Sequence, residues 1–301
     1  MHVSLLVNPA SGRGAGRALG AQLASALSAS GHSVSNVELG GEPGAFLARL
    51  REASAASDVL VIVGGDGTVH HALPGLTGGR AALYHCGMGT ENLFCREFGM
   101  VSEPGRVVAA VGRRLVREID VPHVARPGGT PRPFAIMAGM GPDAGVIRRL
   151  HQARRGPISH ASYVWPLAQE LFGPCLPVVR IEVDGKEVVP AMRGWPLVAN
   201  MRQFALRFDP AARADPADGL LDVVFMPGSD GISAAGWVLS AKDGDHLKSP
   251  KLVYAQGKSV RIVSEPGGNA LQCDGEAIDD AAGWQELQFS LTGPRLRVLI
   301  P

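Results

Sequence analysis

A glycine-rich turn, Gly64-Gly65-Asp66-Gly67-Thr68, carries the clearest chemical pattern in the chain. It follows the apolar run Val59–Val63 and precedes a segment with helical spacing. Glycines let a backbone approach a polyanion closely, and the first turn of a helix presents unpaired N–H groups and the positive end of its dipole. The pattern therefore indicates an anion site, in which Thr68 can donate a hydroxyl and Asp66 must face Mg²⁺ or order the loop. For the bare pattern, an ordinary turn between a strand and a helix is the simpler interpretation.

Two further loops of small residues weaken that simpler interpretation. Asn8–Gly14 (N-P-A-S-G-R-G) lies between an expected strand and an expected helix, and Gly87–Asn92 (G-M-G-T-E-N) follows the expected strand Ala81–Cys86. In a parallel sheet all three loops would leave at the carboxyl ends of the strands, where open α/β folds bind their ligands. We therefore expect one ligand site at that edge.

The first 120 residues alternate short apolar runs with helical patterns, which predicts an α/β unit. Val59–Val63 is typical of a strand buried on both faces of a parallel sheet, and Gly31 predicts the end of the first helix. The expected strands are Val3–Val7, Val34–Glu38, Val59–Val63 and Ala81–Cys86, and the expected helices are Ala15–Ser30, Gly44–Ala53, one from about Val69, Glu91–Phe98 and Pro104–Arg113.

After Arg117 the pattern changes to strands and hairpins, which predicts an antiparallel β domain. The strongest hairpin signal is Asp184-Gly185, a type I′ turn pair between Val178–Val183 and Lys186–Val189. Further expected strands are Pro133–Ala138, Leu197–Met201, Leu221–Met226, Lys258–Val263 and Ala270–Cys273, with helices at Asp143–His151, Ser162–Phe172 (interrupted at Pro166) and Gly231–Ala241.

Composition excludes several classes of protein. Lys and Arg number 29 against 28 Asp and Glu, so no overall field attracts nucleic acid or an anionic membrane. The four cysteines form no C-x-x-C pair, which favours reduced thiols in a cytosolic protein over a disulfide framework or a structural zinc site. We expect no signal peptide and no membrane span, because no stretch approaches the ~20 apolar residues that a span needs.

In their order along the chain, the three loops resemble those of the diacylglycerol kinase, sphingosine kinase and bacterial lipid kinase family. That family has an N-P-x-S-G-x-G opening, a G-G-D-G-T turn and a G-T-x-N segment. The resemblance continues through nearly the whole chain. Gly139–Ala144 is similar to its G-x-G-x-D-A, Asp209–Asp222 to its P-x-A…D-G-x-L-D, and Asp274-Gly275-Glu276 to its late D-G-E.

The resemblance implies two domains with the active site in the cleft between them. Residues 1–119, with 291–301 returning, would form a Rossmann-like α/β domain that binds ATP, and residues 120–290 an antiparallel β-sandwich for the lipid. The implied activity is transfer of the γ-phosphate of ATP to diacylglycerol or a related long-chain lipid alcohol. The implied location is cytoplasmic with peripheral membrane contact, and the partners considered are a lipid at the membrane surface and a homodimer. The implied ATP contacts are Asn8, Ser11, Gly12, Gly64, Gly65, Asp66, Gly67, Thr68 and Thr90.

The resemblance also assigns acidic residues in the second half. Asp274 or Glu276 would be the general base, since a positioned carboxylate can accept the proton of the attacking hydroxyl. A structural Mg²⁺ would be held by Asp215, Asp218 and the carbonyl of Leu220, because hard cations take oxygen ligands. From the residues alone, a solvated turn is the favoured explanation of Asp274-Gly275-Glu276, and ordinary loop carboxylates explain Asp215 and Asp218 equally well.

Three departures from the family pattern bear on activity. His70 and His71 replace an amide and a carboxylate after the G-G-D-G-T turn, and Glu91 stands where Gly or Ala is customary. Residues Gln203–Phe208 replace a glycine cluster. These departures keep open a catalytically weak homologue that binds nucleotide or lipid. A kinase of the NAD kinase or 6-phosphofructokinase type is a further alternative, since both use G-G-D-G-T.

Overall fold

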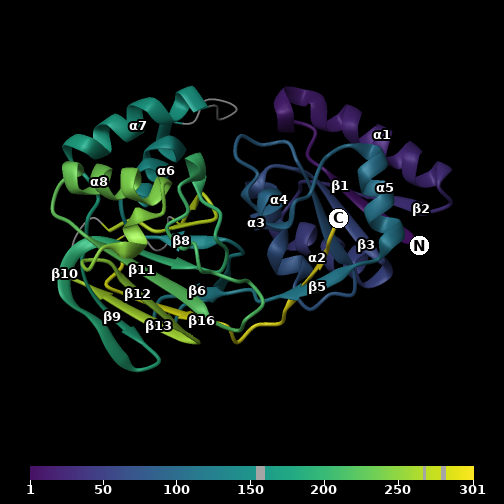
Figure 1. Ribbon diagram of the computed structural model, residues 1–301. Coiled ribbons are helices and arrows are strands. Elements are labelled where there is room, and N and C mark those ends of the chain that lie inside the picture. The colour runs from purple at the N-terminus through teal and green to yellow at the C-terminus, as the bar shows by residue number, and fades with distance from the viewer. Residues whose placement is uncertain (154–159, 267–268, 279–282) are drawn as a thin grey trace. The chain divides into compact units, whose positions relative to one another are not determined.

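The computed structural model describes residues 1–153, 160–266, 269–278 and 283–301 (Figure 1). The chain divides into two compact units, each described separately below. Unit 1 comprises Met1–Val121 and Pro294–Pro301, and unit 2 comprises Pro122–Gly293. The predicted fold class is confirmed, because unit 1 is built on a mainly parallel sheet with helices and unit 2 on antiparallel strands.

Unit 1 contains a six-stranded sheet in the order β2-β1-β3-β4-β17-β5. Four strands run parallel: β1 (His2–Val7), β2 (Ser33–Val37), β3 (Val59–Gly64) and β4 (Ala82–Gly87). Every residue of β3 is buried, as its apolar run predicts. The late strand β17 (Leu296–Leu299) pairs in parallel with β4 and antiparallel with β5 (Val116–Ile119), so this late segment lies in the sheet of unit 1.

Helices connect the strands of unit 1 (Figure 1). The first, α1, ends at Ala29, and Gly31 takes the left-handed conformation with φ 79°, as its position after a helix predicts. The helices are α1 (Ala15–Ala29), α2 (Pro43–Ala56), α3 (Asp66–Leu76), α4 (Leu93–Phe98) and α5 (Pro104–Arg113), with a short 3₁₀ segment, η1 (Ser11–Gly14), before α1.

The main strand path of unit 2 runs β15-β14-β8-β10-β9-β13-β16-β6-β7, and β11 pairs with β10 and β12. The strands are β6 (His123–Ala125), β7 (Arg132–Pro133), β8 (Met137–Gly139), β9 (Val178–Val183), β10 (Lys186–Ala199), β11 (Leu221–Pro227), β12 (Val253–Gly257), β13 (Ser259–Ser264), β14 (Gln272–Cys273), β15 (Glu276–Ala277) and β16 (Glu286–Ser290). Helices α6 (Pro142–Ala153), α7 (His160–Phe172) and α8 (Gly231–Lys242) lie on one side of these strands, with 3₁₀ segments η2 (Ala205–Arg207) and η3 (Asp245–Lys248) (Figure 1).

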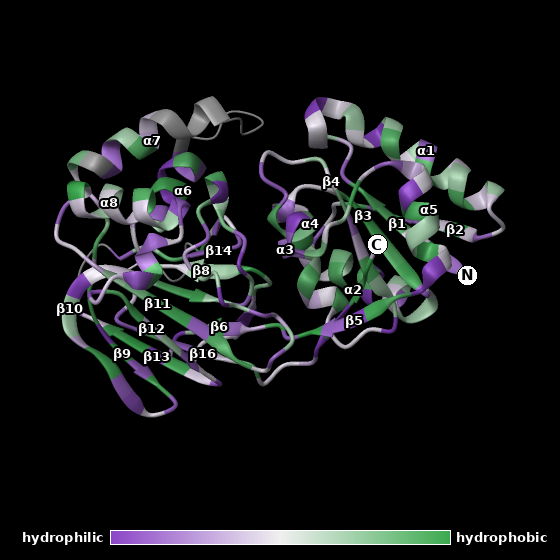
Figure 2. Cartoon of the chain, in the orientation of Figure 1, coloured by the Kyte–Doolittle hydropathy of each residue, from purple (hydrophilic) through white to green (hydrophobic). Residues whose placement is uncertain are grey.

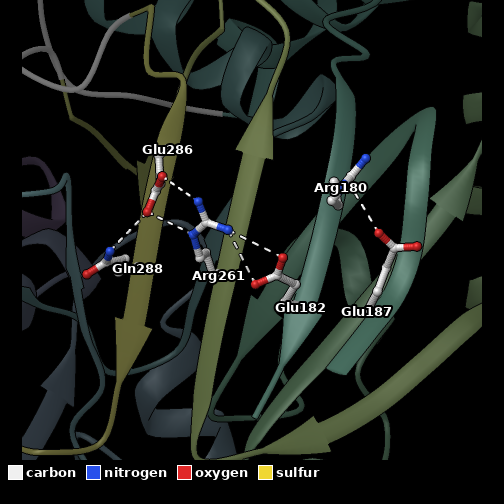
Figure 3. A network of polar contacts seen from close by, with 6 residues as sticks. All are labelled: Arg180, Glu182, Glu187, Arg261, Glu286 and Gln288. Carbon is white, nitrogen blue, oxygen red and sulfur yellow. Dashed lines mark hydrogen bonds and ion pairs between the residues drawn. The ribbon is translucent and has the colours of Figure 1, made fainter. Parts of the chain in front are cut away.

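Strands β9, β13 and β16 bury one face and expose a charged one. Val260 and Ile262 are buried in the core, whereas Arg261 between them points outward. Arg261 forms ion pairs across both neighbouring strands, at 3.3 Å to Glu182 and 2.9 Å to Glu286 (Figure 3). Exposed pairs of this kind contribute little stability, so we assign the network to keeping this face in water and the strands in register.

Three expected elements of unit 2 differ in the structure. Pro133–Ala138 is not one strand but is interrupted between β7 and β8, because the backbone N–H groups of Ala135 and Ile136 donate to the carboxylate of Asp274. Leu197–Met201 is largely the end of the long strand β10. Helix α7 continues through Pro166 without the expected interruption.

Candidate phosphate site and carboxylate hairpin

The three small-residue loops of unit 1 leave the same edge of the sheet. Val7 is in register with Val63, and Gly64 with Gly87, so β1, β3 and β4 end side by side. The second and third loops approach so closely that a Cβ on Gly65 would lie 3.3 Å from the Cα of Gly89. The structure thus brings together the loops that carry the residues predicted to contact ATP.

The first loop is fixed by the side chain of Asn8. Its Nδ2 donates to Oγ1 of Thr68 over 3.2 Å, and its Oδ1 accepts from the backbone N–H of Ala10 over 3.1 Å. Ser11 Oγ donates to the carbonyl of Asn8 over 2.7 Å. Gly12, in η1, has φ 57°, which favours glycine. Asn8 therefore links the first loop to the start of α3.

Asp66 orders the loops. Its carboxylate accepts from the backbone N–H of Leu93 at 2.9 Å and of Phe94 at 3.1 Å, the first two residues of α4. A carboxylate at a helix N-terminus is favourable because it accepts hydrogen bonds from N–H groups that lack a partner in the helix. Its negative charge also interacts favourably with the positive end of the helix dipole. Asp66 and Gly67 form the first turn of α3, where backbone N–H groups lack intrahelical acceptors.

The third loop is held by its own asparagine and by a buried histidine. Asn92 accepts from the N–H of Gly89 at 2.7 Å and donates to the carbonyl of Gly89 at 2.9 Å, which shapes the segment around Thr90. The carbonyl of Gly64 accepts from the N–H of Met88 at 2.7 Å and from Nε2 of His85 at 2.9 Å. The bond from His85 was not predicted, since no local pattern in the sequence marks it.

Glu91 and the histidine pair, which depart from the family pattern, lie in this part of unit 1. Glu91 forms an ion pair with Arg96 over 3.5 Å, so its charge is balanced within the third loop and α4. His70 and His71 lie in α3 with their rings edge to face, 5.5 Å between centroids. His70 is partly buried and His71 is exposed.

In unit 2, Asp274-Gly275 forms the turn between β14 and β15. Asp274 has φ 55° and Gly275 has φ 84°, the two left-handed positions of a type I′ turn. The Asp274 carboxylate is buried and accepts three backbone hydrogen bonds, from Ala135 at 2.8 Å, Ile136 at 2.7 Å and Met137 at 3.2 Å. These bonds anchor the hairpin to the segment before β8.

Glu276 has different surroundings from Asp274. It lies in β15 and is partly exposed. Among the residues that the structure describes, none forms a hydrogen bond or ion pair with its carboxylate. Glu276 is therefore the carboxylate of the pair that is available to a ligand.

A buried polar network connects the hairpin to the start of α6. Asp143 accepts from Trp195 Nε1 and from Gln272 Nε2, each at 2.8 Å, and Gln272 Oε1 accepts from the N–H of Gly275 at 2.8 Å. Burial raises the pKa of Asp143, and its hydrogen-bond donors oppose that rise. Gln272 was not predicted as a site residue; its place one residue before Cys273-Asp274 is the only sequence signal for it.

The residues predicted to hold Mg²⁺ lie in the turns before β11. Asp215 accepts from the N–H of Ala217 at 3.0 Å, and Asp218 accepts from the N–H of Leu220 at 2.9 Å. Within the described residues, no group of three or more His, Cys, Asp or Glu side chains could hold a metal. A metal ion here would therefore depend on two carboxylates, the carbonyl of Leu220 and water.

In this chain an α/β unit with three interlocked glycine loops is followed by a β unit with an acidic hairpin. The comparisons with known families assign each unit to a domain of a kinase family. Residues 2–124 match the diacylglycerol kinase catalytic domain, and residues 136–289 match the YegS C-terminal NAD kinase beta sandwich-like domain. The chain belongs to the diacylglycerol kinase family of YegS-like lipid kinases. Family membership makes it a phosphotransferase that uses a nucleotide.

Individual proteins are similar to the chain in sequence or in fold. A diacylglycerol kinase from Mycobacterium tuberculosis (strain CDC 1551 / Oshkosh) is 27% identical over 277 residues, which cover 91% of this chain and 88% of the relative. A structure described as a diacylglycerol kinase from Bacillus anthracis str. Sterne shares the fold, with TM-score 0.69, 17% identity and coverage of 100% and 97%. Yeast NADH kinase complexed with NADH is a more distant match in fold, with TM-score 0.53, 13% identity and coverage of 100% and 83%.

Proposed function

We propose that the chain is an ATP-dependent kinase that transfers the γ-phosphate to the hydroxyl of diacylglycerol or a related long-chain lipid alcohol. The observation that carries this proposal is the interlocked set of three loops at the ends of β1, β3 and β4. Residues 1–119 with 291–301 are proposed to bind ATP, and residues 120–290 the lipid. Phosphoryl transfer depends mainly on alignment and charge stabilisation, which rigid backbone donors supply without a net basic charge.

The proposed nucleotide contacts lie in the three loops. Backbone N–H groups of Gly65, Asp66 and Gly67 are assigned to the phosphates, because these residues begin α3 and the glycines permit close approach. The remaining contacts are assigned to Asn8, Ser11, Gly12, Gly64, Thr68 and Thr90. Asp66 is assigned to holding α4 in place, since both of its oxygens already accept backbone hydrogen bonds.

Of the two hairpin carboxylates, we assign proton acceptance to Glu276 and positioning to Asp274. Three backbone donors occupy the carboxylate of Asp274, and its role is to fix the turn that presents the next two residues. Glu276 is partly exposed and available. A carboxylate within hydrogen-bond reach of the acceptor hydroxyl can take its proton as the phosphoryl group transfers.

Magnesium enters this proposal in two places. Mg²⁺ bound to ATP would neutralise the phosphate charge. A second Mg²⁺ at Asp215, Asp218 and the carbonyl of Leu220 would order the segment before β11, and the chemistry of these oxygen donors suits that cation.

Exposed apolar side chains in unit 2 support a lipid acceptor met at a membrane surface. Trp165 and Phe172 in α7 are 71% and 93% exposed, and Ile232 and Leu239 in α8 are 85% and 69% exposed. Each pair is separated by seven residues, so its members share one face of their helix. Figure 2 shows the two helices beside each other. No helix among the described residues could span a membrane.

The test is phosphate transfer from γ-labelled ATP to an unbiased lipid extract in mixed vesicles, with NAD and fructose 6-phosphate in parallel reactions. We expect label in one lipid fraction that co-migrates with a phosphorylated alcohol. Gly65→Ala should reduce the transfer, because the new Cβ crowds Gly89, whereas Gly44→Ala places its Cβ in open space and is the matched control. Labelled NAD without labelled lipid would replace the proposal with an NAD kinase.

A catalytically weak homologue is the second candidate, and the departures at His70 and His71 favour it. The ion pair of Glu91 with Arg96 weakens the case from the departure at Glu91, because it balances the added charge. Thermal stabilisation by ATP without label transfer to any acceptor would support this candidate.

A further inference from the structure

His85 connects the buried sheet of unit 1 to the glycine turn. It lies in β4 and is fully buried. Its Nε2 is 2.9 Å from the carbonyl oxygen of Gly64, the last residue of β3, whereas its Nδ1 is buried without a hydrogen-bond partner. Because a carbonyl can only accept, Nε2 carries the proton, and the ring is a single-donor neutral imidazole.

The carbonyl that His85 binds also organises the third loop. It accepts from the N–H of Met88, 2.7 Å away, in addition to the imidazole. Gly64 therefore stands between the turn that begins α3 and the loop that follows β4. An acceptor with two donors is held in direction as well as in distance, which fixes the peptide plane between Gly64 and Gly65.

The side chains in contact with His85 are uncharged. Its ring lies edge to face with Phe94, 6.1 Å between centroids, and its own carbonyl accepts from the thiol of Cys95 at 3.0 Å. Its backbone N–H donates to the sulfur of Met100 at 3.2 Å. The titratable groups nearest along these contacts are Cys95 on α4, Cys86 on the same strand, and Asp66 on α3, which caps the N–H of Phe94. Burial raises the pKa of both thiols, so they stay neutral.

We propose that His85 is a positioning residue for the nucleotide site, holding the Gly64 carbonyl and thereby the orientation of the N–H groups that follow it. This inference rests on the proposed function, since it concerns the same three loops. His85 touches no phosphate in this assignment and acts through the backbone of Gly64.

Two substitutions distinguish the effect of the N–H donor of His85 from the effect of the volume of its ring. His85→Gln keeps an N–H donor that can reach the carbonyl, and His85→Phe keeps a flat ring without a donor. We expect His85→Phe to weaken ATP binding about five- to tenfold, the effect of one lost buried hydrogen bond, and His85→Gln to restore it to within about twofold of wild type. Equal ATP affinity for all three proteins would overturn the proposal.

His246 provides a matched control in unit 2. It too is buried, with Nε2 bonded to a carbonyl, that of Pro210 at 3.0 Å, and with Nδ1 unpartnered. His246→Phe should destabilise the protein to a similar degree and leave ATP affinity unchanged. If it weakens ATP binding as much as His85→Phe, general destabilisation explains the result and the proposal fails.

Two further readouts test the role of His85, and the second needs no ligand. The ratio of ATP dissociation constants of wild type and His85→Gln should stay constant from pH 8 to pH 5, because the ratio cancels the titration of ATP itself. A bend near pH 6.5 would contradict a ring that stays neutral over this pH range. Amide hydrogen exchange at Met88 and Thr68 should accelerate in His85→Phe without ligand. Wild type that binds no ATP refutes the proposed function, while unchanged exchange refutes the role of His85.

Discussion

Asp274 and Glu276, two residues apart in the sequence, have opposite surroundings in the structure. The Asp274 carboxylate is buried under three backbone donors, and Glu276 is partly exposed. Alternation along a strand predicts a shared face for them, but Asp274 lies in the left-handed turn, where alternation does not hold. The difference assigns them separate roles, which substitution can distinguish.

We predict that Glu276→Gln lowers the rate of phosphate transfer by about 100-fold or more and changes the free energy of unfolding by less than about 0.5 kcal/mol. Asp274→Asn should cost about 2 kcal/mol of unfolding free energy, because one amide N–H would then face backbone donors. Initial rates and urea unfolding of both variants are the measurements. A fully active Glu276→Gln protein would place the proton acceptor elsewhere.

The buried imidazole of His85 predicts a pH dependence of stability. Burial lowers its pKa from 6.5 to about 4, with the Gly64 carbonyl opposing the shift. The unfolded chain therefore takes up a proton below pH 6.5 that the folded chain takes up only near pH 4, so stability is lost as the pH falls through this window. The loss amounts to about 2 kcal/mol by pH 5. The unfolding free energy of wild type minus that of His85→Gln should fall by that amount between pH 7.5 and pH 5; a flat difference would refute the buried neutral state.

Residue chemistry could be predicted only where a local pattern fixes it. The turn Gly64–Thr68 was predicted as an anion site because its glycines directly follow a buried strand and permit close backbone approach. The sequence left Asp66 with two roles, and only the contacts with Leu93 and Phe94 distinguish them, 27 and 28 residues away. Gln272 and His85 were not predicted as site residues, because their partners come from distant elements: Asp143 in α6 and Gly64 in β3.

At the scale of elements, the segment before β8 shows how a side chain changes a strand. Residues 133–138 have the composition of a continuous strand, but Asp274 removes two of their backbone donors from the sheet. The hairpin at Asp184-Gly185 was predicted correctly, since both turn residues take the positive φ that this pair favours, 48° and 77°. A turn formed by adjacent residues can therefore be predicted from the sequence. An interruption of a strand by hydrogen bonds to a carboxylate far away in the sequence cannot.

We predict that Gly139→Ala disrupts the start of α6. A Cβ at Gly139 would lie 1.5 Å from Oδ2 of Asp143 and 2.7 Å from Nε2 of Gln272, so the buried network must separate. We expect a loss of about 3 kcal/mol, because a buried carboxyl loses its donors. Gly236→Ala, in α8 of the same unit with open space around it, should gain about 0.5–1 kcal/mol and is the control for thermal unfolding. Equal stability of Gly139→Ala and wild type would contradict the network.

At the scale of the whole molecule, the exposed apolar pairs on α7 and α8 predict vesicle binding. Trp165→Ser with Phe172→Ser, and Ile232→Ser with Leu239→Ser, should each reduce partitioning onto lipid vesicles about tenfold, because each removes two large apolar side chains from the contact. Leu115→Ser in unit 1, 55% exposed, is the control and should leave partitioning unchanged. Vesicle sedimentation measures the effect, and gel filtration tests whether the same surface instead joins two copies of the chain.

The late position of strand β17 in the chain affects when the sheet of unit 1 can be completed during synthesis. It lies between β4 and β5 and is the sheet partner of β5, yet the whole of unit 2 precedes it in the chain. During synthesis on the ribosome, the edge of β4 that faces β17 therefore stays unpaired until Leu296–Leu299 has emerged. The loop that follows β4 is next to this unpaired edge. A nascent chain arrested at residue 293 should have a protease-sensitive first unit, even though all the loop residues proposed to bind ATP have already been made.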